Sequence, residues 1–81
     1  MDEQILEECR QLLAGGECPA GRIVKCFEGR IIRCDAKSLT AEFDTRYMEH
    51  AAYGDLYGNC RLEAQFSVTG EGLALRSICC V

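Results

Sequence analysis

Residues 57–68 carry the pattern that most constrains the fold of this chain, because apolar and polar side chains alternate there over the length of a long strand. The apolar positions are Cys60, Leu62, Ala64, Phe66 and Val68, and the polar positions are Arg61, Glu63, Gln65 and Ser67. Successive side chains of a strand point to opposite faces, so this strand has one apolar and one polar face. Such a strand needs neighbours and a cover for its apolar face, which predicts an antiparallel sheet with one side in water.

The first residues of the chain are expected to supply that cover as an α-helix over about residues 3–14. Its apolar stripe repeats at helical spacing and consists of Ile5, Leu6, Cys9, Leu12 and Leu13. Asp2 is placed to cap the helix, and Gly15-Gly16 is typical of a helix end. The acidic residues of this segment are expected to form the solvated side of the helix.

Four further strands are expected, at about residues 22–27, 30–34, 39–43 and 73–81. Glu28-Gly29 separates the first two of these strands by two residues, which is typical of a tight hairpin. Residues 45–55 follow neither period and are expected to form a helical turn or a long loop.

The 81 residues are therefore predicted to form a single α+β domain, with an N-terminal amphipathic helix and a β-rich body over about residues 22–81. Two architectures stay open at this point. The five or so antiparallel strands can close into a small barrel plugged by the helix, or form a curved sheet with the helix on one face.

The formal net charge of −4 is unevenly distributed. Residues 1–17 alone carry a net −4, residues 22–37 carry +3, and residues 38–81 carry −3. This distribution argues against a globally basic nucleic-acid-binding protein and against an acidic mimic of DNA.

Two groups of residues are predicted to bind a partner. The first is the basic hairpin, with Arg22, Lys25, Arg30 and Arg33 around Phe27, which could meet phosphate or an acidic protein surface. The second is the aromatic segment with Tyr47, Met48, Tyr53 and Tyr57, because tyrosine is favoured at interfaces. The alternatives are that the basic residues only pair with the acidic remainder, and that the tyrosines fold back to close one end of a barrel.

The seven cysteines are expected to be reduced and to serve mainly as small apolar side chains. No C-x-x-C spacing is present, so no metal site is predicted, although Cys18, Cys26 and Cys34 recur every eight residues and could share a face. A strand would point Cys79 and Cys80 to opposite faces, so one of them is expected to be buried and the other to be open to oxidation.

No catalytic or cofactor motif is found in the sequence. There is no G-x-S-x-G and no phosphate-binding G-x-x-x-x-G-K-[ST]. His50 is the only histidine, so any cysteine–histidine nucleophile pair must use it, and the alternation leaves Cys60 pointing inward. His50 is more simply read as a surface residue. We therefore expect a protein that is not an enzyme and needs no cofactor.

The favoured hypothesis is a non-catalytic, cytoplasmic protein-binding module that acts as an adaptor, regulator or inhibitor through a sheet edge, the basic hairpin and the aromatic segment. A homodimer is plausible through the same edge. No secretory signal or membrane span is recognised, and no membrane partner is expected. The alternatives are a small barrel that binds a nucleotide or single-stranded nucleic acid, and a cysteine-based metal or redox protein.

Overall fold

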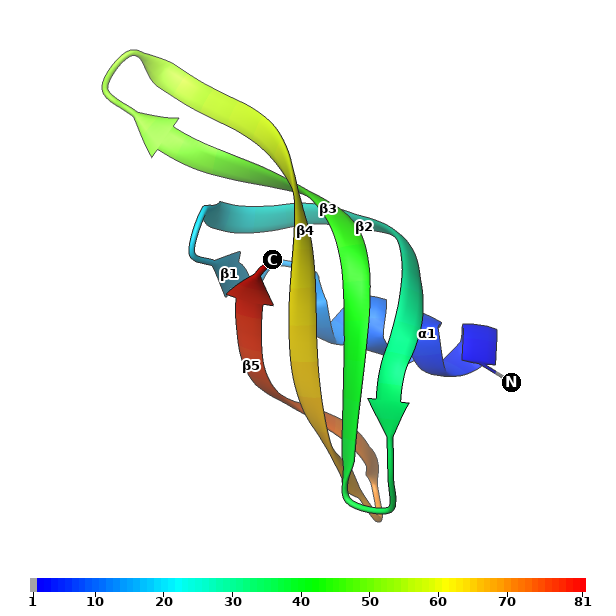
Figure 1. Cartoon of the computed structure of the whole chain (residues 1–81). Coiled ribbons are helices and arrows are strands. Elements are labelled where there is room, and N and C mark those ends of the chain that lie inside the picture. Colours follow the sequence, from blue (N-terminus) through cyan, green and yellow to red (C-terminus); the bar gives the residue numbers. More distant parts are fainter. Residues whose placement is uncertain (1) are drawn as a thin grey trace.

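The computed structural model describes residues 2–81, which form one helix and five strands. The elements are α1 (Asp2–Leu13), β1 (Glu17–Cys18), β2 (Gly21–Cys34), β3 (Ser38–Ala51), β4 (Gly54–Thr69) and β5 (Gly72–Cys80). The strands pair antiparallel in chain order to give one sheet (Figure 1). The predicted α+β class, with an N-terminal helix and five antiparallel strands, is confirmed.

The sheet is curved and open. Within the described residues β1 pairs only with β2, and β5 pairs only with β4, so the first and last strands do not complete a ring of hydrogen bonds. The curved sheet with a helix on one face is therefore the architecture observed, and the closed barrel is not formed.

Helix α1 lies against the inner face of the sheet and packs on β2 and β5. Of the five residues of the expected stripe, Leu6, Cys9 and Leu13 are buried and Ile5 is partly buried, whereas Leu12 is exposed. Gly15, with φ of +78°, follows the helix and reverses the chain. Among the described residues no helix combines the length and the apolar character that crossing a membrane requires.

The apolar core lies between α1 and the inner faces of β3 and β4. It contains the expected inward positions of β4, Leu62, Ala64 and Phe66, together with Leu39, Ala41, Phe43 and Ile23. Cys60 is half-buried and Val68, near the end of β4, is 38% exposed, so the alternation predicted burial best at the middle of the strand.

The predicted first hairpin is wrong, because residues 21–34 form one continuous strand. A tight two-residue hairpin turn needs positive φ, and neither Glu28 nor Gly29 has it. The register instead shifts between Cys26 and Gly29, which marks a β-bulge. Gly29 serves a different purpose, since the ring of Phe43 occupies the space that a Cβ would need.

The predicted loop over residues 45–55 is also wrong. These residues complete β3 and begin β4, and the two strands pair without a register shift as far as Ala51 and Gly54. β2 pairs with β3 only as far as Met48, so residues 49–56 extend beyond the body as a two-stranded arm. The arm projects at the upper left of Figure 1, and the molecule measures 46 × 19 × 19 Å.

Candidate functional site

Four of the predicted basic side chains occupy one face of the sheet. Arg22, Lys25, Arg30 and Arg33 of β2 lie opposite Met48, Arg46, Glu42 and Thr40 of β3, which are all even-numbered and therefore share a face. Three register shifts in β2 make this possible, because the basic residues themselves do not follow a period of two. We call this surface of β2, β3 and β4 the outer face; it is opposite to α1 and the core.

Two exposed aromatic rings stand on the outer face, each beside a cation. The Lys25 ammonium lies 5.4 Å from the ring centre of Phe27, and the Arg46 guanidinium lies 5.1 Å from the ring centre of Tyr57. Phe27 is 41% and Tyr57 54% exposed. Cation–π contacts of this kind hold long basic side chains in place while leaving their charge accessible.

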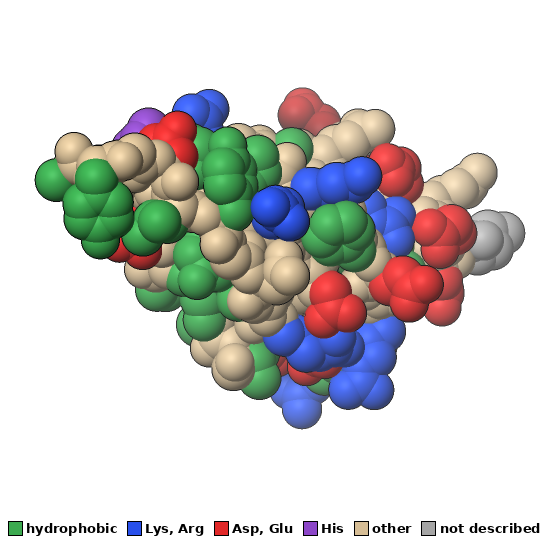
Figure 2. Space-filling view, turned by 90° about the horizontal axis from the view of Figure 1, so that it is seen from above, with side chains coloured by type: hydrophobic (Ala, Val, Ile, Leu, Met, Phe, Trp, Pro, Cys, Tyr) green, Lys and Arg blue, Asp and Glu red, His purple; other side chains and the backbone are tan. Residues whose placement is uncertain are grey.

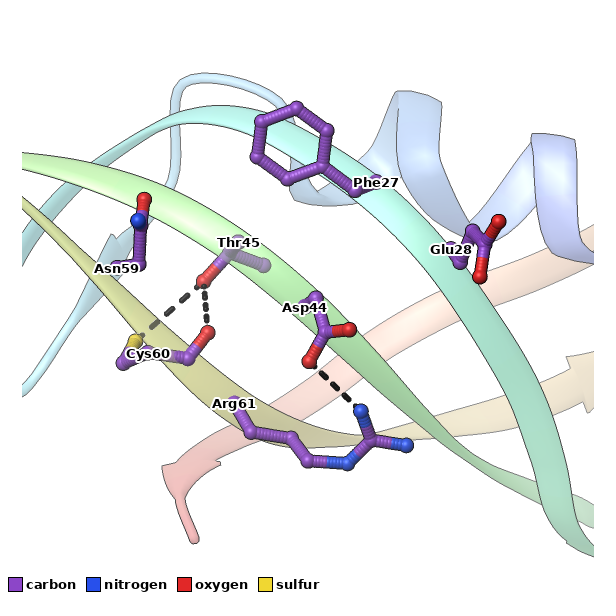
Figure 3. Close-up of a pocket in the computed structure, with 7 residues that line it drawn as sticks. All are labelled: Phe27, Glu28, Asp44, Thr45, Asn59, Cys60 and Arg61. Carbon is purple, nitrogen blue, oxygen red and sulfur yellow. Dashed lines mark hydrogen bonds and ion pairs between the residues drawn. The ribbon is translucent and has the colours of Figure 1, made fainter.

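A hollow of about 620 Å³ opens beside Phe27 (Figure 3). It is lined by Phe27, Glu28, Asp44, Thr45, Asn59, Cys60 and Arg61. On its floor Arg61 donates hydrogen bonds from Nε to Glu42 Oε1 at 2.6 Å and from Nη1 to Asp44 Oδ1 at 2.7 Å. These bonds fix the guanidinium, and the bond from Arg61 is the main reason that the pKa of the Glu42 carboxyl lies below its ordinary value.

Most of the sequence-predicted binding residues are brought together on this face, including the two groups that had been assigned to separate segments. The members on the outer face are Arg22, Lys25, Phe27, Arg30, Arg33, Met48 and Tyr57. Tyr47 is not among them, because it points to the inner side, where it packs against the core and lies over Gly58. Tyr53 stands apart at the tip of the arm and is 86% exposed.

Sequence reasoning missed Arg46, Asn59 and Arg61 as members of the site. The alternation in β4 predicts that Arg61 lies on the polar face of its strand. It does not predict which residues of the neighbouring strands Arg61 contacts. Arg46 was missed because it lies in residues 45–55, which were predicted to form a helical turn or a loop. Its position opposite Lys25 follows only from the β-bulges of β2.

The arm is apolar at its end and unpaired along one side. Figure 2 shows hydrophobic side chains gathered at the left end of the molecule, where the arm lies. Tyr53 and Leu56 are exposed there. β5 pairs with β4 only from Leu62 onward, so among the described residues no strand covers the outer edge of β4 over residues 54–60, a stretch whose only charged side chain is Asp55.

His50 lies on the arm and pairs with Asp55, its Nδ1 being 2.7 Å from Asp55 Oδ1. In the β3–β4 register His50 is opposite Asp55 and Cys60 is opposite Thr45, so His50 and Cys60 are separated by five positions of the ladder. The structure therefore does not bring the histidine to the cysteine, and the exposed ring agrees with the expectation of a surface residue.

Three thiols converge on the other side of the sheet. Sγ atoms of Cys18 in β1, Cys60 in β4 and Cys80 in β5 all lie within 4.8 Å of one another, and we call them the thiol triangle. The convergence of Cys18 with Cys26 and Cys34, which the sequence left open, is not observed in the part of the chain described, because the latter two lie eight residues apart along the long strand β2. Desolvation by the surrounding protein is the main cause that raises the pKa of the Cys80 thiol, and the Cys60 thiol adds to it.

The expectation that one of Cys79 and Cys80 is buried is wrong. Both are exposed, because β5 is the last strand of the sheet and has a partner on one side only. Cys9 is the fully buried thiol of the helix, and burial raises its pKa to about 11. That thiol therefore stays protonated at neutral pH.

A scan against protein-family models found no match, and searches of the curated proteins and of the solved structures found no similar chain. Function is therefore inferred from the chemistry of the outer face, the arm and the thiols.

Proposed function

We propose that this chain is a non-catalytic protein-binding module whose outer face takes an acidic segment of another protein. The observation that carries the proposal is the gathering of arginine, lysine, methionine and aromatic side chains from three strands onto one accessible face. Arginine, tyrosine, phenylalanine and methionine are the residue types enriched in protein interfaces, and a rigid sheet presents them at little entropic cost.

The charge of the face favours an acidic partner. Arg22, Lys25, Arg33 and Arg46 have no carboxylate within ion-pair distance among residues 2–81, whereas Arg30 and Arg61 are held by Glu42. Four cations are thus free to meet carboxylates of a partner, and the two that rest on aromatic rings are already oriented. The hollow beside Phe27 offers room for one apolar side chain of the same segment.

A protein partner is favoured over a nucleic acid by the carboxylates within the face. Glu42 and Asp44 lie at its centre, and Glu63 lies opposite Glu42 on β4. A phosphate backbone crossing the sheet would pass these charges, whereas a protein segment can place its acidic side chains at the periphery and neutral ones over the centre. The two aromatic rings also have cations beside them, which reduces their availability for base stacking.

The uncovered edge of β4 supplies a second element of the same surface. An extended partner segment that pairs along residues 54–60 would direct alternate side chains onto the outer face beside Tyr57. Because this edge carries little charge, it favours a partner segment whose side chains are uncharged along residues 54–60. The acidic side chains of the partner would then lie nearer β2.

The test uses random peptides displayed on phage as the probe, selected against the full chain. Selected sequences are expected to combine acidic residues with an aromatic or aliphatic residue. Their binding, measured by fluorescence anisotropy, is expected to weaken at least about tenfold when Arg22 and Arg46 are both reversed to Glu. Arg76→Glu is the matched control, because Arg76 is exposed on β5, outside the outer face.

Four outcomes would reject the proposal. Selection of peptides without acidic residues, or equal loss of binding in Arg76→Glu, would remove the outer face as the site. Tighter binding of a single-stranded oligonucleotide, lost in the double reversal and steeply weakened by salt, would assign the face to nucleic acid instead. Light scattering at increasing concentration tests whether the occupant is a second copy of the chain. A dimer that dissociates when Arg22 and Arg46 are reversed to Glu would mean that the outer face binds a second copy.

A further inference from the structure

We infer that the thiol triangle is a metal site, in which Cys18, Cys60 and Cys80 bind one Zn²⁺ ion through their three sulfur atoms. The thiol triangle lies on the inner side of the sheet and shares only Cys60 with the lining of the hollow, and the inference does not depend on the proposed function. Three thiolates leave a tetrahedral zinc ion with one further position.

The distances agree with shared ligation. Cys60 Sγ and Cys80 Sγ lie 4.0 Å apart, and Cys18 Sγ lies within 4.8 Å of both. Two thiolates on the same tetrahedral zinc are separated by about 3.8 Å, given Zn–S bonds of about 2.3 Å. Contractions of less than about 1 Å, within the reach of a change in χ1, would complete the triangle around an ion.

The backbone around each sulfur is already fixed. Cys60 lies in the unbroken β3–β4 ladder. Its carbonyl oxygen accepts a hydrogen bond of 3.0 Å from the Thr45 hydroxyl, and its Sγ lies 3.3 Å from Thr45 Oγ1. Cys80 pairs with Leu62 in the β4–β5 ladder, and Cys18 pairs with Gly21 in the β1–β2 ladder. Preformed ligands with hydrogen-bonded surroundings are the features that distinguish a metal site from a chance meeting of thiols.

Exposure increases across the triangle in the way that a binding site requires. Cys18 is buried, Cys60 is half-buried and Cys80 is exposed. An ion can therefore enter beside Cys80 and meet the deeper sulfurs next, while the fourth position faces solvent. Each thiol that binds Zn²⁺ releases its proton to water, so three ligands release three protons.

Apolar packing alone accounts for this arrangement less well. Cysteine packs as a small apolar side chain where it is buried, as Cys9 does. Packing gives no reason for the exposed Cys80 to direct its sulfur toward two others. The ligands are 42 and 20 residues apart in sequence, which is why no zinc-binding spacing could be recognised.

The bound ion would join strands that backbone hydrogen bonds leave apart. Cys18 belongs to the first strand of the sheet and Cys80 to the last, and these strands are not paired with each other. A zinc ion would thus fasten the two ends of the sheet through side chains, and the folded chain would be more stable with the metal than without it.

The experiment uses the full chain, reduced and freed of metal. Zn²⁺ is titrated in competition with a chromophoric chelator, and one ion per chain is expected. Co²⁺ is then used as a spectroscopic probe, with thiolate-to-cobalt charge-transfer absorption in the near ultraviolet and the visible bands of tetrahedral cobalt expected. Zn²⁺ is also expected to raise the Tm of the chain.

Cys80→Ser is the decisive variant, because Cys80 is exposed and its replacement leaves the core intact. It is expected to weaken Zn²⁺ binding at least about tenfold and to abolish the charge-transfer band. Cys79→Ser and Cys34→Ser are the matched controls, since both thiols are exposed and lie outside the triangle.

Three results would overturn the inference. These are unchanged zinc affinity in Cys80→Ser, an equal loss of affinity in Cys79→Ser, and a reduced chain that binds Cu⁺ but not Zn²⁺. Mass spectrometry after mild oxidation provides a further test. A chain that forms a Cys60–Cys80 disulfide and shows no zinc binding when reduced would assign the triangle to thiol redox chemistry.

Discussion

Replacement of Gly29 by alanine should destabilise the chain strongly, because Phe43 fills the space above the bare α-carbon. A Cβ at position 29 would overlap Phe43 Cδ1 and would lie 2.5 Å from Phe43 Cε1 and 2.8 Å from the carbonyl oxygen of Glu42. The Phe43 side chain is fully buried and the carbonyl belongs to the sheet backbone, so neither can retreat freely. The strand or the core must move instead.

Overpacking of a well-packed core costs about 1–3 kcal/mol. Two ring atoms and one backbone atom are all approached below 3.0 Å here, so we expect a loss near the upper end, about 3 kcal/mol of unfolding free energy. For a domain of this size that loss lowers the Tm by about 12–24 °C. Urea unfolding followed by circular dichroism measures it, and the midpoint should fall with an unchanged m-value.

Gly70→Ala is the matched control, since an added Cβ meets no atom within 4 Å and Gly70 does not have positive φ. Its stability should be unchanged or slightly raised. A loss below about 0.5 kcal/mol in Gly29→Ala would refute the steric reasoning. So would simple additivity with Phe43→Leu, because a smaller side chain at position 43 should relieve part of the clash.

Three further predictions concern hydrogen bonds made by side chains. Asp35 accepts hydrogen bonds from two backbone N–H groups, which lower its pKa below the ordinary 3.8. Its stabilising effect is therefore present above pH 3.8 and lost as the pH falls through the lowered pKa, so thermal unfolding of Asp35→Ala at decreasing pH should show a smaller acid-induced loss of stability than the wild type shows. Thr45→Val removes a buried hydroxyl that donates to the Cys60 carbonyl at 3.0 Å and should lower the unfolding free energy by about 1–2 kcal/mol in urea titrations; an unchanged value would contradict the assigned bond. Glu8→Ala removes the carboxylate that accepts the Leu73 N–H at 2.9 Å, so the Leu73 amide should exchange its hydrogen faster, while amides at the middle of β4 keep the wild-type rate.

The sequence predicted those parts of the fold in which one residue pattern dictates one structure. The helical stripe of Leu6, Cys9 and Leu13 and the alternation around Leu62 and Phe66 each require a single periodicity, and both are confirmed. The hairpin at Glu28-Gly29 was predicted from turn propensity, which a long-range contact overrides. The ring that needs Gly29 comes from another strand, and its position could not be read locally.

The candidate sites were predictable in composition but not in arrangement. Arg22, Lys25 and Arg30 were recognised as a basic group, yet their common face depends on bulges that no local pattern announces. The arm was missed because the aromatic residues that flank it, Tyr47 and Tyr57, lie on opposite faces of the sheet and obscure the alternation. The thiol triangle joins residues from distant strands, so only the folded sheet reveals it.

The chain order of the strands also determines when the molecule can fold. β3 and β4 pair over fourteen residue pairs in an unbroken register, and they need only a short turn to meet. Helix α1, by contrast, packs on β5 as well as on β2, and β5 follows the other described strands in the chain. We expect the β3–β4 hairpin to form early and the apolar stripe of the helix to stay partly uncovered until β5 has been synthesised. Ribosome-bound chains that end before residue 72 should therefore leave Leu6 and Leu13 more open to a chaperone or a protease than chains that include β5.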